Sequence, residues 1–185
     1  MLVSAMMTSI SIVREKEFGT MEALLVSPLK PLQIILGKVT PYVLLSFVNA
    51  VTIIFLGYLV FGLPVRGSLV LLLGATILFI TLSLSLGILI STFSRSMQVA
   101  MFISVFTLML PTILLSGFIF PIENMPEILQ WLSYIVPPRY FVTIIRNIML
   151  KGTDLIHIWM EISVILGMTL LFITLSVIKF KTRLE

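Results

Sequence analysis

Residues Arg14–Pro31 read REKEFGTMEALLVSPLKP and separate two apolar segments of the chain. The stretch begins with alternating charges, continues through a flexible Phe18-Gly19 pair, and then becomes a short apolar run over Met21–Val26. A membrane protein that needed only a turn here would use a handful of residues. The length and composition therefore predict a separate short helix held at a membrane face, between two membrane-embedded segments.

The apolar run carries the signals of a helix beginning and a helix end. Thr20 is placed to cap the free amide groups, and Glu22 in the first turn favours the helix dipole. Pro28 ends the run, because a proline disfavours helical geometry in the residue before it. The apolar side of this helix comprises Met21, Leu24 and Leu25. The residues alone leave two interpretations open: a helix that lies on lipid, and a helix that docks into a soluble partner.

The composition is that of a protein that crosses a membrane several times. Of the 185 residues, 59% are hydrophobic and 11% are charged, and the mean hydropathy is +1.19. These values predict an all-α polytopic membrane protein, with room for about five helices of roughly 20 residues each. The basic residues form no continuous patch, which argues against nucleic-acid binding. The absence of cysteine excludes a disulfide framework and thiol chemistry.

Four apolar segments are long enough to cross the hydrocarbon core of a membrane as helices. They are residues 39–62, 68–93, 98–120 and 156–178. Residues 1–13 are apolar but too short to cross, and they lack the basic region and cleavage site of a signal peptide. They are therefore expected to be the end of a truncated first helix. Pro111 interrupts the third span and predicts either a static kink or a hinge.

The second of these spans carries small residues at every fourth position. They are Ser83, Gly87 and Ser91, which a helix places on one face. Small side chains allow helices to approach closely in lipid, so this face is a candidate for helix packing. An ordinary scatter of small residues is the other interpretation of the same pattern.

The distribution of basic residues predicts the orientation of the chain. By the positive-inside rule, the side whose short loops hold more Lys and Arg faces the cytoplasm. The cytoplasmic segments would hold Arg14, Lys16, Lys30, Lys38, Arg95, Lys179, Lys181 and Arg183, and the external segments would hold Arg66, Arg139, Arg146 and Lys151. This bias places residues 14–31 in the cytoplasm and residues 121–152 outside.

Residues 121–152 are too polar and too interrupted to cross the membrane, and they predict an external hairpin of two interfacial or re-entrant helices. Pro137-Pro138 separates two amphipathic segments, and Gly152 is a fitting end for the second. Trp131 and Tyr134 suit the depth of lipid headgroups, as does Tyr140. The candidate site residues of this hairpin are Pro121, Glu123, Pro126, Pro137, Arg139 and Tyr140.

The sequence lacks the residue patterns of nucleotide-binding, metal-binding and catalytic sites. There is no Walker A pattern, G-x-x-x-x-G-K-[ST], so ATP-driven work would need hydrolysis on another polypeptide. No metal-ligand cluster and no catalytic residue is predicted. His157 and Glu161 lie four residues apart near the external end of the last span, where the carboxylate either reaches headgroups or pairs with the histidine. A proton relay through this pair would make the chain an ion-coupled secondary carrier or a channel, and a non-transporting structural subunit is a further alternative.

Residues Glu15–Pro28 resemble the E-x-E-x-G-T-x-E-x-L-x-x-[ST]-P segment of ABC-2 type permeases, the membrane subunits of one class of ATP-binding-cassette exporters. In that family this segment is the coupling helix against the ATPase. The order S-G-F-I-F-P-I-E-N-M-P, followed by S-Y-x-x-P-x-R-Y-F, also resembles the family, in which this region caps the external mouth of the pathway. The resemblance assigns ATPase coupling to Glu15, Glu17, Gly19, Thr20, Met21, Glu22, Leu24, Leu25 and Pro28.

The resemblance implies that the chain is the C-terminal part of an ABC-2 permease in a bacterial or archaeal inner membrane. Its partners would be cytoplasmic ATPase subunits, a second permease subunit in a homodimer or heterodimer, and membrane lipid. It would be a transport subunit and not an enzyme, with ATP bound by the partner and no cofactor of its own. ATPase closure would push on the coupling helix and open a pathway at the dimer interface. The aliphatic, Phe-rich and Met-rich spans suit a hydrophobic or amphipathic export substrate, such as a drug or a lipid-like molecule.

Overall fold

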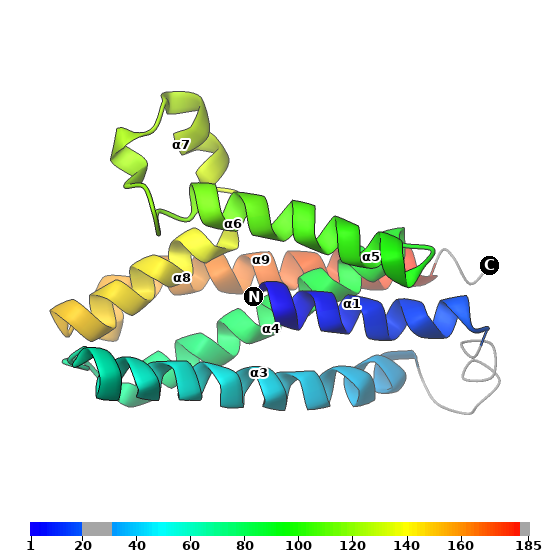
Figure 1. The fold of residues 1–185 in the computed structure, drawn as a ribbon, viewed down its shortest axis with the longest axis horizontal. Coiled ribbons are helices and arrows are strands. Elements are labelled where there is room, and N and C mark those ends of the chain that lie inside the picture. Colours follow the sequence, from blue (N-terminus) through cyan, green and yellow to red (C-terminus); the bar gives the residue numbers. More distant parts are fainter. Residues whose placement is uncertain (20–30, 182–185) are drawn as a thin grey trace. The chain divides into compact units, whose positions relative to one another are not determined.

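The structure, a computed structural model, describes residues 1–19 and 31–181, and every regular element in these ranges is a helix (Figure 1). The α-helices are α1 (Leu2–Glu17), α3 (Pro31–Phe61), α4 (Leu69–Phe93), α5 (Met97–Ser104), α6 (Leu110–Leu115), α7 (Glu127–Ser133), α8 (Pro137–Arg146) and α9 (Leu155–Lys181). Shorter segments are the π-helices η1 (Val105–Met109) and η3 (Asn147–Lys151), and the 3-10 helix η2 (Ile122–Asn124). The predicted helix over residues 21–26 lies outside the described residues.

Within the described ranges, four helical segments are long and apolar enough to cross a membrane. They are Gly37–Phe61, Leu69–Phe93, Met97–Leu115 and Leu155–Ser176. The all-α polytopic architecture predicted from the sequence is thereby confirmed. The third segment ends at Leu115, before the predicted end at Phe120, because Gly117 adopts a left-handed conformation with φ of +74° that does not continue a helix.

The charged beginning of the polar stretch belongs to α1. The helix runs without a break from the apolar residues 1–13 to Glu17, so Arg14 and Lys16 lie in its last turn. Cations in this position interact favourably with the C-terminal end of the helix dipole. Gly19 follows with φ of +70°, a left-handed conformation that favours glycine.

The chain divides into two compact units. Unit 1 comprises Met1–Ser46, Ile80–Leu108 and Thr169–Glu185, and unit 2 comprises Phe47–Phe79 and Met109–Met168. The described basic residues that the positive-inside rule assigns to the cytoplasm all fall in unit 1. Those that it assigns to the exterior all fall in unit 2.

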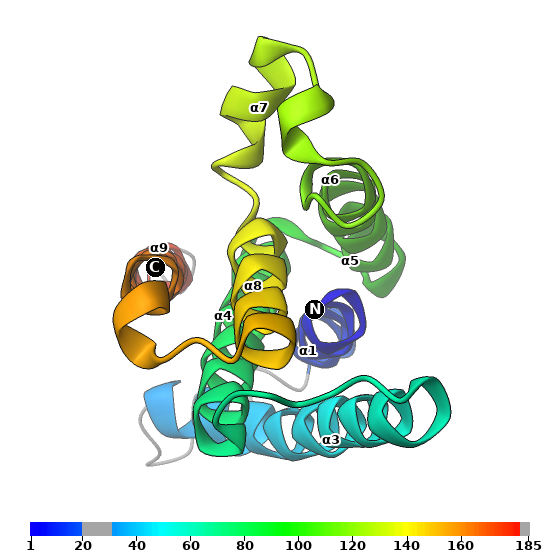
Figure 2. The ribbon, with the colours of Figure 1, turned by 90° about the vertical axis from the view of Figure 1, so that its left-hand side faces the viewer.

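Unit 1 has its core between α1, α5 and the second half of α4. α1 lies alongside α5 (Figures 1 and 2). Ala5, Ile90 and Leu108 form a buried cluster there. Since lipid is as apolar as these side chains, close packing and interhelical hydrogen bonds hold such helices together. One such bond joins α3 to α1, where Ser46 Oγ donates to Ser4 Oγ at 2.7 Å.

Unit 2 packs α8 against the first half of α4. The rings of Phe79 and Phe141 stack with their centroids 4.0 Å apart. Ile144 and Ile148 are fully buried, and the backbone amide of Gly67 donates to Ile148 O at 3.0 Å. α6 and α7, joined through η2, form a hairpin that leads back to α8 (Figure 2).

The interruption predicted at Pro111 takes the form of a π-helical segment. Val105–Met109 is π-helical, and α6 begins at Leu110 with Pro111 in its first turn. Proline has no N–H to donate to the preceding turn, and a wider turn ahead of it accommodates this loss. The span therefore passes through the proline without a break in helical structure.

Candidate functional site

Three consecutive charged residues at the end of α1, here called the charged triplet, each bind a different helix. Glu15 forms a salt bridge with Lys38 of α3. Lys16 Nζ donates to the backbone oxygen of Ser91 on α4 at 2.6 Å. Glu17 Oε2 accepts a hydrogen bond from the backbone N–H of Met97, the first residue of α5, at 2.8 Å.

The geometry of an α-helix explains why three neighbouring residues reach three helices. With 3.6 residues per turn, successive side chains leave the axis about 100° apart. An uninterrupted run of charges therefore faces several directions, unlike charges spaced three or four apart, which share one face. At the end of α1, each of these directions meets another helix of unit 1.

The charges of Lys16 and Glu17 match the helix ends that they contact. The C-terminal turn of α4 presents carbonyl oxygens and partial negative charge, which suits the Lys16 ammonium. The N-terminal turn of α5 presents free N–H groups and partial positive charge, which suits the Glu17 carboxylate. Ser96 caps the same end of α5 by accepting from Val99 N at 3.3 Å.

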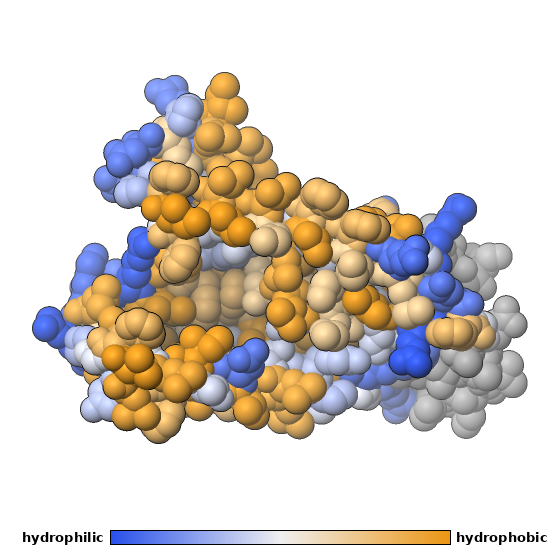
Figure 3. Space-filling view, in the orientation of Figure 1, coloured by the Kyte–Doolittle hydropathy of each residue, from blue (hydrophilic) through white to orange (hydrophobic). Residues whose placement is uncertain are grey.

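Two contacts between a basic side chain and an aromatic ring lie at this end of unit 1. The Lys179 ammonium of α9 lies 4.0 Å from the ring centroid of Phe93, the last residue of α4. The Arg14 guanidinium lies 5.9 Å from the ring centroid of the exposed Phe18. Both distances fall within the range of a cation–π interaction. Hydrophilic residues gather at the end of α1 from which the chain leads into residues 20–30 (Figure 3).

Of the residues assigned to ATPase coupling, the structure describes Glu15, Glu17 and Gly19. The two carboxylates bind other helices of unit 1, as above. Thr20, Met21, Glu22, Leu24, Leu25 and Pro28 lie outside the described residues. Sequence reasoning missed Lys16, Lys38 and Ser91 as parts of this site. The alternating charges of REKE were visible, but Lys16 and Glu17 bind backbone groups that lie 75 and 80 residues away and carry no side-chain signal.

The predicted small-residue face of α4 is turned into the protein. Ser83 and Ser91 are buried. At Gly87 a side chain would overlap the backbone oxygen of Ala5 and lie 3.0 Å from Thr8 Cβ. This face of α4 therefore meets α1 at Gly87, and Ser91 provides the backbone oxygen that Lys16 binds.

Arg139 and Tyr140 fix the connection between α7 and α8 in unit 2. The Arg139 guanidinium donates to Ser133 Oγ and lies 3.9 Å from the ring centroid of Tyr134. Tyr140 OH donates to Tyr134 O at 2.9 Å. Burial raises the pKa of the Tyr140 phenol above its ordinary value, against the opposing effect of Arg139. The phenol therefore remains a donor at physiological pH.

The other predicted hairpin residues lie at element boundaries. Pro121 precedes η2 and Glu123 lies within it, Pro126 is the residue before α7, and Pro137 begins α8 and is buried. The apolar side chains around α7 remain exposed, with Ile128 at 76% and Trp131 at 74%. Hydrophobic and hydrophilic residues occupy opposite sides of this segment (Figure 3).

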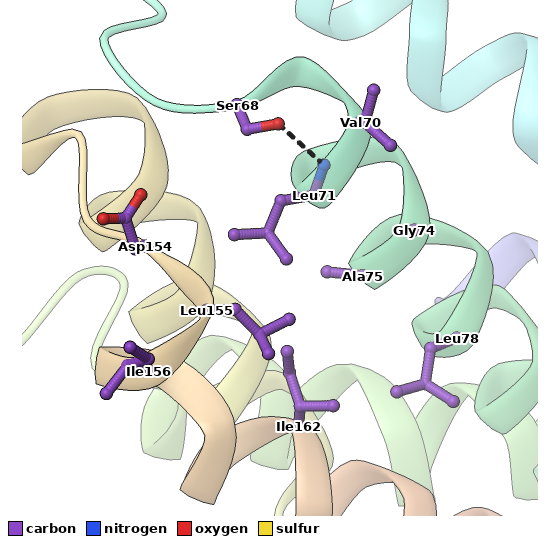
Figure 4. A pocket seen from close by; sticks show the side chains of 10 residues that line it. All are labelled: Ser68, Val70, Leu71, Gly74, Ala75, Leu78, Asp154, Leu155, Ile156 and Ile162. Carbon is purple, nitrogen blue, oxygen red and sulfur yellow. Dashed lines mark hydrogen bonds between the residues drawn. The ribbon is translucent and has the colours of Figure 1, made fainter.

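An apolar groove of about 660 Å³ lies between the N-terminal parts of α4 and α9 in unit 2. Leu155 and Ile162 of α9 point toward Leu71 and Ala75 of α4 across it (Figure 4). Ser68 lies at its rim, where its hydroxyl accepts from Leu71 N at 3.4 Å. Its lining residues are Ser68, Val70, Leu71, Gly74, Ala75, Leu78, Asp154, Leu155, Ile156 and Ile162.

His157 and Glu161 form no ion pair within the described part of the chain. Oε2 of Glu161 is buried and has no hydrogen-bond partner there, while His157 is exposed. Residues 1–19 and 31–181 contain no group of three or more acidic or histidine side chains that could hold a metal ion.

Comparison with known proteins relates almost the entire chain to one family. Residues 1–150 match the family model described as "ABC-2 type transporter". The chain is 34% identical over 184 residues to "Probable multidrug ABC transporter permease YbhS" of Escherichia coli, covering 100% of the chain and 49% of that protein. It is 40% identical over 152 residues to "Probable multidrug ABC transporter permease YbhR" of the same organism, covering 82% of the chain and 41% of that protein.

A more distant match is "ABC transporter G family member 20" of Dictyostelium discoideum, 27% identical over 178 residues, covering 95% of the chain and 24% of that protein. No solved structure matches. The chain spans about half the length of the Escherichia coli permeases that it matches, and about a quarter of the Dictyostelium discoideum protein.

Proposed function

The chain belongs to the ABC-2 type transporter family, and from this premise we propose that it is a permease subunit of an exporter driven by ATP hydrolysis on a separate subunit. Two copies, or this chain and a related one, would form the transport pathway in a bacterial inner membrane. The chain itself would carry no catalytic residue. Residues 20–30 would provide the helix that docks on the cytoplasmic ATPase subunit.

The single observation that carries this proposal is the set of contacts at the end of α1, the helix that precedes residues 20–30 in the chain. The charged triplet there binds α3, α4 and α5. A force applied at this end of α1 would therefore reach several membrane-spanning helices. Coupling between distant sites requires rigid, contacting elements of this kind.

The substrate that we propose is hydrophobic or amphipathic. The groove between α4 and α9 is lined mostly by aliphatic side chains, with Ser68 and Asp154 at its polar end. Such a surface offers apolar contact and few fixed charges, which suits a drug-like or lipid-like molecule. Two of the relatives carry "multidrug" in their names, which agrees with this class of substrate.

Substitutions in the predicted docking helix test the proposal directly. Glu22→Lys reverses a charge at the start of this helix, and Leu24→Asp places a carboxylate on its apolar side. We expect each variant to insert into the membrane normally. We expect each to retain about tenfold less ATPase subunit in co-purification, equivalent to about 1.4 kcal/mol of binding free energy.

The matched controls are Glu127→Lys and Leu132→Asp, the same changes on exposed residues of α7 in unit 2. They should retain the ATPase subunit at the wild-type level. If the docking variants co-purify with the ATPase subunit as well as these controls do, the docking role of residues 20–30 is wrong.

A further inference from the structure

The charged triplet joins three helices at the point where the chain leaves for residues 20–30. We propose that Lys16 and Glu17, supported by Glu15, are positioning residues that transmit movement of those residues to the turn between α4 and α5. This inference rests on the proposed function, because an ATPase subunit must move residues 20–30. It also gives Glu15 and Glu17 a role inside the permease in place of direct contact with the ATPase.

The contacts of the triplet hold the α4–α5 turn from both sides. Lys16 binds Ser91 O near the end of α4, and Glu17 binds the first N–H of α5. Only residues 94–96 separate the two helices. Hydrogen bonds in which one partner is charged are shorter and stronger than neutral ones. The turn therefore follows the last turn of α1 in any displacement that leaves these two bonds intact.

The order of the charges is specific for this arrangement. A carboxylate beside the carbonyl end of α4, or an ammonium beside the amide end of α5, would face partial charge of its own sign. Lys16 and Glu17 each meet the opposite sign. A pair of charges selected only for solubility would not need this order.

α1 is itself firmly packed, so its last turn does not move independently of the rest of the helix. Ile12 and Val13, directly before the charged residues, are 3% and 0% exposed. Nearer the start of α1, Gly87 of α4 allows the backbone of α1 to approach closely at Ala5. Packed interiors deform little and shift as discrete elements. A displacement at residues 20–30 is thus passed along α1 to α4 and α5.

A reporter on α5 measures this transmission without knowledge of the substrate. The chain contains no cysteine, so Val99→Cys provides a single attachment site for an environment-sensitive fluorophore on an exposed position of α5. The labelled full chain is reconstituted with its ATPase subunit. The change in emission on adding ATP and vanadate then reports movement of α5, and co-purification reports ATPase binding.

Substitutions of Lys16 and Glu17 on this background separate transmission from docking. Lys16→Met keeps an apolar chain of similar length without the donor, and Glu17→Ala removes the acceptor. We expect both to keep the ATPase subunit bound and to reduce the nucleotide-dependent emission change about threefold or more, within the usual effect of coupling substitutions. Lys16→Arg and Glu17→Gln retain a donor and an acceptor, and they should restore most of the response. Lys151→Met, on η3 in unit 2, is the control for loss of a lysine and should behave as wild type.

Two results would overturn the inference. An undiminished emission change in Lys16→Met and Glu17→Ala would mean that these bonds transmit nothing. Loss of ATPase binding in either variant would mean that the residue belongs to the docking surface. Should Lys16→Met fail to accumulate in the membrane, the Glu17 variants decide the question, because Glu17 is exposed and its replacement disturbs no packing.

Failure of the proposed function would look different from failure of this inference. If residues 20–30 do not dock on an ATPase, the wild-type protein itself shows neither ATPase binding nor a nucleotide response. If only the inference fails, the wild-type response is present and Glu22→Lys still lowers ATPase binding about tenfold. The two hypotheses are thus distinguished within one set of proteins.

Discussion

At the scale of single residues, Gly87 sets the distance between α1 and α4 in unit 1. A Cβ at this position would overlap the backbone oxygen of Ala5 and lie 3.0 Å from Thr8 Cβ. Backbone atoms cannot rotate away as the end of a flexible side chain can. Gly167 on α9 differs, since a Cβ there meets nothing within 4 Å. The two glycines therefore allow the same substitution to be compared in a crowded and in an open position.

Gly87→Ala should destabilise the protein by about 1–3 kcal/mol, because the added methyl group forces α1 and α4 apart. Gly167→Ala should be neutral or stabilising by up to about 1 kcal/mol, since alanine favours the helix more than glycine does. The midpoint of thermal unfolding in detergent micelles measures both effects. A Gly87→Ala protein as stable as Gly167→Ala would contradict the close approach of the two helices.

Sequence patterns identify residues of this kind only in part. The spacing of Ser83, Gly87 and Ser91 marked a face of α4 as a packing candidate, because periodicity within one helix is visible in the sequence. The contacts of Lys16 and Glu17 were not foreseen. Their partners are backbone groups of distant residues, and every residue type presents the same backbone groups. Such contacts become apparent only once the helices are placed beside one another.

At the scale of elements, the span from Met97 to Leu115 combines α-helix with a π-helical segment before Pro111. Proline in a regular helix interior removes a hydrogen bond and collides with the preceding turn, at a cost of about 3 kcal/mol. The wider π turn relieves this collision and leaves the helix continuous. π segments of this type are frequent at functional sites.

Pro111→Ala supplies the missing N–H and removes the ring. We therefore expect Val105–Met109 to change from a π-helix to a regular α-helix. We expect a modest gain in stability, of about 1 kcal/mol, because part of the cost is already relieved by the existing geometry. Amide hydrogen exchange at residues 105–110 should slow as the regular hydrogen-bond pattern forms. Pro126→Ala is the control, since Pro126 is the N-cap residue of α7, where its carbonyl accepts from the first turn and an N–H would have no helical partner. Unchanged exchange in Pro111→Ala would show that the π segment does not depend on the proline.

The presence of the membrane-spanning helices was easier to predict than the residues at which helices end. Long apolar runs identify membrane-spanning helices, because lipid requires every backbone group to be satisfied within the helix. The end of the third span at Leu115 was predicted five residues too late, since Ser116–Phe120 is apolar enough to continue it and only the conformation of Gly117 shows that it does not. The helical state of residues 14–17 was also not evident, because their charges suggested a loop.

At the scale of the whole molecule, basic residues and the absence of cysteine make the orientation testable. The described basic residues assigned to the cytoplasm lie in unit 1, and those assigned to the exterior lie in unit 2. Phe18 and Ile128 are exposed residues of the two units, at 65% and 76%. Single cysteines at these positions have no background from other thiols.

In spheroplasts treated with a membrane-impermeant maleimide, Ile128→Cys should react and Phe18→Cys should not. After permeabilisation, both should react to a similar extent. The expectation follows from the positive-inside rule, since loops rich in Lys and Arg remain in the cytoplasm. Reaction of Phe18→Cys from outside would place residues 20–30 on the wrong side for a cytoplasmic ATPase, and the proposed function would fail with it.

The length of α3 makes the protein sensitive to the thickness of the membrane around it. The 31 residues of this helix give a rod about 46 Å long, against a hydrocarbon layer of about 30 Å. A rod longer than the layer must lean over or extend beyond it, and the degree of leaning depends on the length of the surrounding acyl chains. Bilayer thickness therefore acts on this protein as a physical variable in its own right, so thin and thick membranes should favour different tilts of α3.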